Sequence, residues 1–548
     1  MSSEEKGEAG ETKNEINLDT ILIEEVGQFG RYQLLTLALA ALPVIFSAFA
    51  SGEYIFTTAR VPSRCLISQC DGDSPDFAPQ WKEFAIPTTS SGAFDQCLRF
   101  SNSSFQVPVQ PGTCPASLFD TSSTEECDAY VYENTNSVVY DFDLACDEWR
   151  RSLIGSIRTI GTLLVLPITG YISDRWGRRV ALTINAFNTG WIGLVRSFVN
   201  SYDWFLALEV IESAVGAGAY SSCYILVTEL VGPKYRVIAG ATISTLFAVG
   251  QVILGFIAWG MPEWRPLTQI LYAPQLLVVS YFWILSESVR WLMSKGRYEE
   301  SEEILKKVAK RNKKELSQKS LEALRASAEA EKNIEKPKEQ WLPILVFKSR
   351  VLLGRCCVTP IWWITNTLVY YGMNINAVNL SGNSYLNYAI VAAIEIPGYW
   401  TAILLLDRIG RKPVLICAYA LCAVCQFTFA FLPEGMDELS LAMYLIGKYS
   451  IAVVMTSVYV YTAELYPTKY RHNLFAFSSM VGRLGSITAP LTPALAQEVW
   501  ESLPSVLFGS FALLSGLLIL TTPETLGTKL PDTIEDAENL GKKTVNSE

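Results

Sequence analysis

The sequence predicts an all-α membrane protein with twelve transmembrane helices in two six-helix bundles and a disulfide-rich extracellular loop. Half of the 548 residues are hydrophobic and 18% are charged, with a mean hydropathy of +0.23, which is too apolar for an ordinary soluble protein. A charged turn that occurs once in each half of the chain and a hydrophilic loop with six cysteines are the other two observations behind this fold class.

The repeated turn lies between two apolar runs in each half. It reads Asp174-Arg175-Trp176-Gly177-Arg178-Arg179 in the first half and Asp407-Arg408-Ile409-Gly410-Arg411-Lys412 in the second. The glycines let helix ends approach closely, and the arginines favour the cytoplasmic side of a membrane. The repeat therefore indicates two related halves placed side by side.

The amino-terminal segment, residues 1–33, is polar and acidic and is expected in the cytoplasm. It lacks the pattern of a removable signal peptide. Between Leu18 and Val26, apolar and acidic residues alternate at helical spacing, which predicts a short, solvated surface helix. The first span follows from about Leu34 to Phe56, which at about 1.5 Å per residue can cross a hydrocarbon core of roughly 30 Å.

The next segment, residues 57–149, is predicted to be an extracellular loop. It has 14 Asp and Glu against 4 Lys and Arg, and it holds Cys65, Cys70, Cys97, Cys114, Cys127 and Cys146. An even number of cysteines without histidine predicts three disulfides in an oxidising compartment rather than a metal site, and all fifteen pairings stay open. Asn102 begins an acceptor sequon, so we expect it to be glycosylated.

Further apolar runs complete two bundles of six spans. The first bundle, residues 34–285, continues with runs near 153–172, 180–199, 204–230, 237–259 and 264–285. The second, residues 351–520, has runs near 351–373, 386–406, 413–431, 439–462, 474–495 and 503–520. Each run has about the length that a membrane-spanning helix needs.

The segment between the bundles, residues 286–350, is predicted to be a cytoplasmic linker. It carries 16 Lys and Arg against 11 Asp and Glu, and this excess of bases is typical of the cytoplasmic side. Ile304, Val308, Leu316 and Leu321 recur at helical spacing, which predicts short helices. The polar tail, residues 521–548, is also expected in the cytoplasm.

Several predicted spans contain charged residues. A charge inside a membrane costs about 2.5 kcal/mol or more, so each such residue should pair, face water or contact a substrate. The residues are Glu53, Arg158, Glu209, Glu212, Glu395, Lys448 and Arg483. We expect Glu209 and Glu212 to face an outer vestibule, and Arg158 to pair with Glu53 or Glu212 because an unpaired buried arginine is hard to tolerate.

Aromatic residues in the spans are candidates for binding an ammonium group through their ring faces, and the acids Glu53 and Glu395 are candidates to face the same group. Tyr220 and Tyr224 lie four residues apart, and so on one helix face. Trp363, Tyr370 and Tyr371 lie close together in the seventh run. Helix packing is the alternative role for such residues.

The motifs resemble those of the organic cation, organic anion and carnitine transporter family of the major facilitator superfamily. Besides the repeated turn and the cysteine-rich loop, the matching stretches are Gly27–Gln33, Glu287 with Arg290-Trp291-Leu292, Tyr370-Tyr371-Gly372, Glu395-Ile396-Pro397, Tyr461–Thr468 with Arg471, and Pro523-Glu524-Thr525. The resemblance covers nearly the whole chain. Ser286 and Val289 depart from it, because the family usually has proline at both positions.

The resemblance implies roles for individual residues. Tyr370 and Tyr371 match a substrate-lining pair, and Tyr399 resembles the carnitine-type members, since anion transporters typically carry lysine there. Arg483 stands where carnitine and anion transporters have arginine, so a substrate or coupling role is expected. Glu395 and Lys448 lie in recurring motifs, which leaves ligand contact and helix packing or gating both open.

A second implied set is a cytoplasmic latch that opens and closes the transporter. It comprises Asp174, Arg175, Arg178, Glu229 and Arg236 in the first half and Asp407, Arg411, Glu464 and Arg471 in the second. With both termini cytoplasmic, the two bundles would rock about a site near the middle of the bilayer.

The resulting hypothesis is a plasma-membrane transporter for small organic cations or zwitterions, such as carnitine-like compounds or amines. Sodium or a proton is a possible coupling ion, the lipid bilayer surrounds the chain, and nothing indicates nucleic-acid binding. An organic anion transporter of the same family and a receptor on a transporter scaffold are the alternatives. An enzyme is not expected, because there is one histidine and no metal-ligand spacing, nucleophile–base pattern or cofactor motif.

Overall fold

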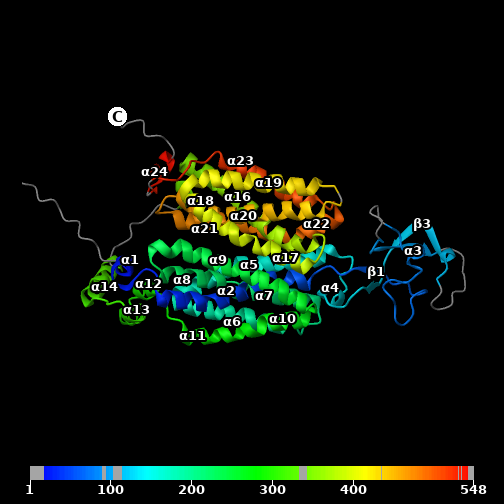
Figure 1. Ribbon diagram of the computed structural model, residues 1–548, viewed down its shortest axis with the longest axis horizontal. Helices are drawn as coiled ribbons and strands as arrows, with labels where there is room; N and C mark the ends of the chain where they lie inside the picture. Colours follow the sequence, from blue (N-terminus) through cyan, green and yellow to red (C-terminus); the bar gives the residue numbers. More distant parts are fainter. Residues whose placement is uncertain are drawn as a thin grey trace, which may run out of the picture.

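The computed structural model has two helical bundles side by side and a small disulfide-bonded domain at one end (Figure 1). It describes residues 18–88, 94–102, 114–332, 342–433, 435–528, 530–531 and 533–540. The two chain ends that were predicted to be cytoplasmic, residues 1–17 and 541–548, lie outside this range. We call the end of the bundles that carries the disulfide-bonded domain the cysteine-rich end, and the other the opposite end.

The first bundle makes six passes between these ends. Its elements are α2 (Arg31–Thr57), α5 (Glu148–Trp176), α6 (Arg178–Arg196), α7 (Tyr202–Gly216), α8 (Ala219–Leu230), η3 (Pro233–Tyr235), α9 (Arg236–Gly260), α10 (Trp264–Tyr272), η4 (Ala273–Ser280) and α11 (Tyr281–Ile284). Helix α5 starts where the Asp147 side chain accepts a hydrogen bond from the Arg150 N–H at 2.9 Å, which satisfies one of the free donors of a helix start.

The second bundle repeats this arrangement. Its elements are α16 (Arg350–Asn376), η5 (Ala377–Asn379), α17 (Ser384–Ala393), α18 (Glu395–Ile409), α19 (Arg411–Phe431), α20 (Asp437–Leu465), α21 (Arg471–Thr488), η6 (Ala489–Leu491), α22 (Thr492–Glu498) and α23 (Leu503–Ile519). The predicted turns at Gly177 and Gly410 have φ of +109° and +114°, a region that glycine adopts without steric cost.

The twelve passes in the described residues agree with the predicted fold class. Eight are long and apolar enough to cross a membrane on hydropathy alone. Of the other four, α23 has only 17 residues, and α6, α16 and α21 contain arginines. These helices can keep such residues because protein, and not only lipid, surrounds them.

The cysteine-rich loop forms a small domain with two antiparallel strand pairs. Its elements are β1 (Ser63–Cys65), α3 (Lys82–Ala85), β2 (Leu98–Asn102), η2 (Ala116–Leu118), β3 (Phe119–Glu126), β4 (Tyr130–Tyr132) and α4 (Val138–Asp141), with β1 paired to β4 and β2 to β3. The three predicted disulfides are confirmed as Cys65–Cys127, Cys70–Cys114 and Cys97–Cys146. They hold together a domain whose apolar core is small. Asn102 is exposed at the end of β2.

Helices at the opposite end form two small cores. The first combines α1 (Leu18–Ile21), the π-helix η1 (Leu22–Val26), α12 (Val289–Ser294), α13 (Tyr298–Asn312) and α14 (Gln318–Lys332). The second packs α15 (Leu342–Lys348) and α24 (Ile534–Asn539) against the second bundle. The prediction of a solvated helix at residues 18–26 is wrong. Its apolar residues Leu18, Ile21 and Val26 are buried against Leu305 and Val308 of the linker, because both segments present an apolar face that neither can bury alone.

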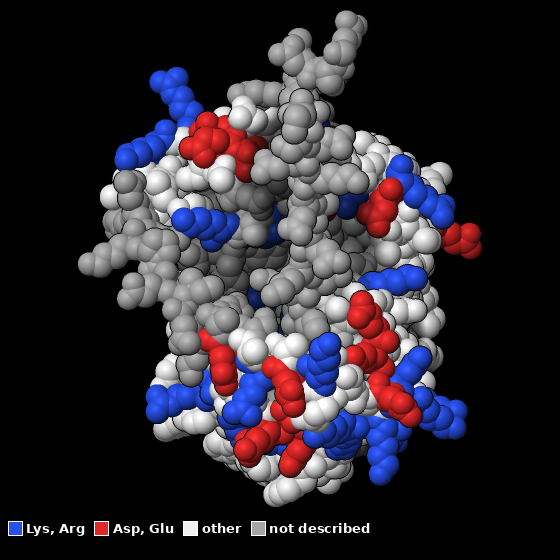
Figure 2. All heavy atoms as spheres, turned by 90° about the vertical axis from the view of Figure 1, so that its left-hand side faces the viewer, with Lys and Arg blue, Asp and Glu red and all other residues white. Residues whose placement is uncertain are grey.

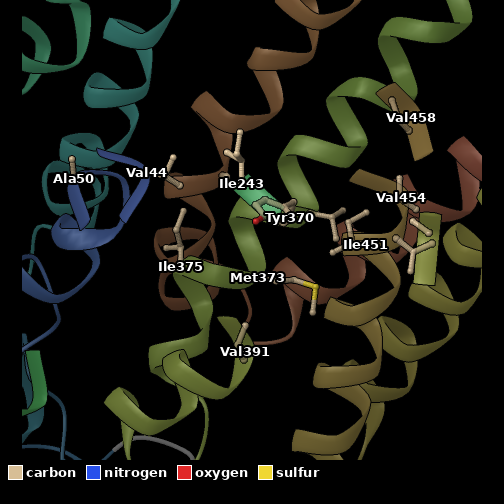
Figure 3. Packing of buried hydrophobic residues seen from close by; sticks show 14 of the residues in the cluster. Val44, Ala50, Ile243, Tyr370, Met373, Ile375, Val391, Ile451, Val454 and Val458 are labelled. Carbon is tan, nitrogen blue, oxygen red and sulfur yellow. The ribbon is translucent and has the colours of Figure 1, made fainter. Parts of the chain in front are cut away.

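The main hydrophobic core extends through both bundles. Figure 3 shows Val44 and Ile243 of the first bundle near Tyr370 of the second, and Met373 and Ile451 nearby. A core that both halves share fixes the position of the polar residues between them.

The bundles meet closely at the cysteine-rich end, in a contact that we call the seam. The rings of Phe56 and Tyr385 stack with centroids 5.5 Å apart. A Cβ atom on Gly52 would lie 2.4 Å from the Tyr388 hydroxyl, so glycine is needed for this approach. At the opposite end, Figure 2 shows a hollow between the two lobes. The structure is therefore closed at the cysteine-rich end and open at the other.

Candidate functional site

A hydrogen-bonded group around Glu395 forms the centre of the second bundle. The carboxylate lies 2.9 Å from the Lys448 ammonium and accepts hydrogen bonds from the hydroxyls of Tyr370 and Tyr399 at 2.5 and 2.8 Å. Asn374 donates to it at 3.3 Å. All five side chains are buried, so the charge of Glu395 is matched inside the protein and is not free to attract a ligand.

Lys448 is fixed from two further directions. Its ammonium donates to the Tyr370 carbonyl at 2.8 Å and lies 3.7 Å from the centroid of the Tyr370 ring. The group thus joins α16, α18 and α20. The structure brings four of the predicted substrate-site residues, Glu395, Lys448, Tyr370 and Tyr399, into contact. Their charges and hydrogen-bonding groups are satisfied by one another.

Arg483 differs from the other charged residues in the spans. It is half-buried on α21, and it has no ion pair with any described residue. Its buried Nε atom has no hydrogen-bond partner in the part of the chain that the structure describes. Tyr371 and Tyr459 lie within electrostatic range of its guanidinium. Glycines at 482 and 485 let α21 pack tightly on α16, which fixes the position of Arg483.

Aromatic rings from both bundles surround this region. In the second bundle, the Trp363 ring packs edge-on against Tyr459 at 4.7 Å, and its N–H donates to Thr462 at 3.0 Å. In the first bundle, Tyr220 and Tyr224 lie on α8 with ring centroids 6.4 Å apart. Tyr224 of the first bundle and Tyr459 of the second lie near each other and are 39% and 43% exposed, so these two rings face the space between the bundles.

A second group of charges, which we call the outer charge cluster, lies in the first bundle toward the cysteine-rich end. It comprises Glu53, Arg158, Arg196, Glu209 and Glu212. Arg158 pairs with Glu209 and, at 2.8 Å, with Glu212. Arg196 pairs with Glu53 and Glu212 at 2.8 Å and lies 2.6 Å from Glu209. No side chain in the cluster is more than 8% exposed.

The cluster corrects two predictions and bears out part of a third. Glu209 and Glu212 are buried in ion pairs and do not face a vestibule. Of the two partners predicted for Arg158, Glu212 is confirmed, whereas Glu53 pairs with Arg196. Glu53 therefore lies apart from the aromatic residues with which it was grouped.

The first half of the predicted latch is held together within its own bundle. Arg178 pairs with Asp174 at 2.8 Å and approaches Glu229 at 3.5 Å. Arg175 donates to the hydroxyl of Tyr171 at 2.7 Å. Arg236 pairs with Asp19 of α1 at 2.5 Å instead of with Glu229.

The second half of the latch repeats this pattern. Arg411 pairs with Asp407 at 3.1 Å and with Glu464 at 3.0 Å. Arg471 donates to Thr468 at 3.0 Å. Among the described residues, no ion pair joins the two bundles at this end, as expected of a structure that is open there.

Several functional candidates were not predicted from the sequence. Arg196 lies in the run 180–199 but close to its end, where a long arginine can reach the membrane surface, and it was not counted as an intramembrane charge. Tyr459 and Tyr272 carry no local signal, because many tyrosines in the spans serve packing alone.

Comparisons with known proteins identify the family. The family model described as sugar (and other) transporter matches residues 116–536. An organic cation transporter protein of Drosophila melanogaster is 32% identical over 539 residues, which cover 96% of each chain. Solute carrier family 22 member 3 of Mus musculus is 29% identical, again over 96% of each chain.

A solved structure supports the fold. The xylose transporter XylE from E. coli, in a partially occluded inward-open conformation, has a TM-score of 0.60 and 17% identity, and the match covers 91% of this chain and all of that one. Since the matching relatives are membrane transporters and the helices are apolar, the chain is a multi-pass membrane protein. It belongs to the solute carrier family 22 of organic ion transporters, within the major facilitator superfamily.

Proposed function

We propose that this protein transports small organic cations or zwitterions, such as carnitine-like compounds or amines, across the plasma membrane by alternating access. Family membership supports transport as the activity. The seam and the hollow support the mechanism, because opening the one and closing the other would expose the same central residues to the other side. In that second state, the two halves of the latch would approach each other and hold the opposite end closed.

The unpaired Arg483 is the observation that carries the substrate class. A charge without a partner inside a membrane is costly, and a bound ligand of opposite charge removes that cost. A guanidinium offers two parallel N–H donors, which fit a carboxylate. The exposed rings of Tyr224 and Tyr459 are suited to an ammonium group. A compound that carries both groups uses both features.

An organic anion is the second candidate, and one observation favours it. Glu395 and Glu53 are both matched by bases, so neither offers a free negative charge to a cation. A plain cation would have to bind to aromatic rings alone, beside the positive charge of Arg483.

Uptake into cells that express the protein tests the proposal. Three radiolabelled probes are compared with and without sodium: L-carnitine, tetraethylammonium and para-aminohippurate. We expect time-dependent accumulation of carnitine, and less of both tetraethylammonium and para-aminohippurate. Accumulation of para-aminohippurate alone would select the second candidate, and binding without accumulation would indicate a receptor.

The proposed orientation places both termini in the cytoplasm and the cysteine-rich end outside the cell. Asn102 would then carry a glycan. Enzymatic deglycosylation should increase the gel mobility of the wild type and leave that of Asn102→Gln unchanged. An antibody against an amino-terminal tag should bind only after the cells are permeabilised, and binding to intact cells would reverse the orientation.

A further inference from the structure

We propose that the outer charge cluster binds one proton, on Glu209, and exchanges it with the compartment at the cysteine-rich end when the seam opens. The cluster has three carboxylates and two guanidiniums, which leaves an excess of one negative charge. Its five side chains are at most 8% exposed. A net charge in such a buried site is costly, and one bound proton removes it.

The hydrogen bonds indicate which carboxylate takes the proton. Both oxygens of Glu53 are satisfied, one by the Thr268 hydroxyl at 2.6 Å and the other by Arg196 at 2.8 Å. Both oxygens of Glu212 are satisfied as well: Oε1 by Arg158 and the Tyr272 hydroxyl at 2.8 and 3.2 Å, and Oε2 by Arg196 at 2.8 Å.

Glu209 is the exception. Its Oε2 accepts a hydrogen bond from Arg158, but its buried Oε1 accepts none from any residue that the structure describes. Although Oε1 lies 2.6 Å from an Arg196 nitrogen, no N–H bond is directed at it. This oxygen is the one place in the cluster where an added proton displaces no existing donor.

Other charges on the surrounding helices do not cancel the excess. On α5, Glu148 pairs with Arg151 and with Arg60 of the loop, and these two arginines are 12% and 31% exposed. On α10, Arg265 pairs with Asp141. Asp203 at the start of α7 is exposed, and Tyr54 and Tyr272 are neutral. Within the described part of the chain, no further buried base pairs with the carboxylates of the cluster.

A proton fits better than a metal cation. Protein donors occupy five of the six carboxylate oxygens of the cluster. Among the described residues, there is no group of acidic, histidine or cysteine side chains arranged to hold a metal ion. Sodium would need several of these oxygens at once and would have to displace the guanidiniums.

The cluster is positioned to respond to the seam. On α2, Glu53 is flanked by two residues of the seam. Gly52 contacts Tyr388 of the second bundle, and Tyr54 packs at the point where Gly155 meets Pro490 of the second bundle. One turn of α2 therefore faces the cluster on one side and the seam on the other. When the bundles separate there, water gains a path to the cluster, which is how a proton could be linked to transport.

The test uses the purified full-length protein without substrate. The thermal unfolding midpoint of the wild type should fall as pH rises from 6 to 8.5. In this range the folded state keeps a proton on Glu209 that the same glutamate has lost in the unfolded state. Because the state that binds more protons loses stability as pH rises, the folded state is destabilised. Glu209→Gln should flatten this slope to less than half. Glu263→Gln, which removes an exposed carboxylate at the same end of the same bundle, should keep the wild-type slope.

Surface density in cells gives a second, independent readout. Glu209→Gln leaves the cluster neutral and should reach the surface like the wild type, whereas Arg158→Gln raises the excess to two negative charges and should reduce surface density several-fold. Combining the two changes restores an excess of one negative charge and should recover most of the lost surface density. Equal loss in the two single variants would overturn the proposal, as would a wild-type pH slope in Glu209→Gln or a midpoint that depends on sodium and not on pH.

The link to transport rests on the proposed function and is tested separately. Carnitine uptake by the wild type should depend on external pH, and uptake by Glu209→Gln should not. If no probe is transported, the proposed function fails, while the unfolding and surface-density measurements still decide whether the cluster holds a proton. A pH dependence of uptake that persists unchanged in Glu209→Gln would refute the link.

Discussion

At the scale of single residues, the forked shape of Arg483 makes a prediction about substrate choice. Arg483→Lys keeps the positive charge but loses the two parallel donors. We expect the initial rate of carnitine uptake to fall about tenfold, which corresponds to about 1.4 kcal/mol, while tetraethylammonium uptake is unchanged. Uptake is measured in cells and divided by the amount of surface-biotinylated protein. Equal loss for both probes would show that Arg483 serves the transport cycle and not carboxylate recognition.

The pair of Glu395 and Lys448 makes a second prediction, this time about stability. Both side chains are fully buried, and removing one partner of a buried pair typically costs about 3–5 kcal/mol because the other charge stays behind. Lys448→Gln should therefore lower the thermal unfolding midpoint and the surface density strongly. The double variant with Glu395→Gln has no buried charge left and should recover part of both.

A double-mutant cycle on these two residues separates pairing from a general packing effect. Tyr419→Phe is a suitable control, since it removes a buried hydroxyl that donates to the Trp362 carbonyl at 2.8 Å elsewhere in the same bundle. If the double variant is as unstable as the sum of the single changes, Glu395 and Lys448 do not stabilise each other.

The sequence predicted most of the charged residues of these groups and one pairing, Arg158 with Glu212, but not the remaining partners. It predicted that Arg158 must pair, because charge inside a span is costly whatever the fold. The choice among Glu53, Glu209 and Glu212 depends on how α2, α5 and α7 are rotated against one another, and no local pattern encodes that. For the same reason, Glu395 could be predicted as a buried acid, but its neutralisation by Lys448 could not.

At the scale of helices, two buried or half-buried glutamates hold the repeated turns. Glu287 accepts hydrogen bonds from the backbone N–H groups of Arg178 and Arg179 at 2.8 and 3.2 Å. Glu524 does the same for Arg411 and Lys412, at 3.0 Å each. Each carboxylate thus sits at the positive N-terminus of a helix, α6 or α19. The repeat in the sequence is matched by a repeat in structure.

The acidity of Glu524 follows from this position. Partial burial opposes its ionisation, but four backbone N–H donors outweigh that effect and lower its pKa. Because the pKa is lowered in the folded state, the contribution of Glu524 to stability is complete at neutral pH and is lost only as pH falls into the acidic range.

We therefore expect Glu524→Gln to reduce the free energy of unfolding at pH 7 by about 1 kcal/mol, given its exposure to solvent. Glu287→Gln should cost more, since Glu287 is only 5% exposed. Thermal unfolding at pH 7 measures both, with the exposed Glu501 changed to Gln as the control. If Glu287→Gln and Glu501→Gln have equal effects, the glutamates do not hold the turns.

Most helices of the bundles could be predicted from the sequence, but the burial of the segment from Leu18 to Val26 could not. Long apolar runs have a single stable solution in a membrane, so their number and approximate ends follow from composition. The segment from Leu18 to Val26 has no such constraint. Its burial depends on a matching apolar face in the linker about 280 residues away, which short-range periodicity does not reveal.

At the scale of the whole molecule, the net charge of −10 is concentrated at the cysteine-rich end, where the loop supplies 14 acids against 4 bases. If that end faces outside, the acidic loop raises the local concentration of cationic compounds near the seam. The seam itself is built from small residues and aromatic rings, and its closure decides which side the central site faces.

The packing at Gly155 allows closure of the seam to be tested directly. A Cβ atom at this position would lie 2.7 Å from both Pro490 and Tyr54, so Gly155→Leu should hold the two bundles apart at the cysteine-rich end. Gly260→Leu adds the same side chain at the same end, where nothing lies within 4 Å, and serves as the control.

We expect Gly155→Leu to reach the cell surface but to lose nearly all uptake of carnitine, since alternating access needs the closed seam. A cysteine introduced at Val378, which lines the seam beside Gly155, should react faster with a membrane-impermeant thiol reagent in Gly155→Leu than in the wild-type background. Unchanged reactivity together with normal uptake would mean that the seam does not need to close during transport.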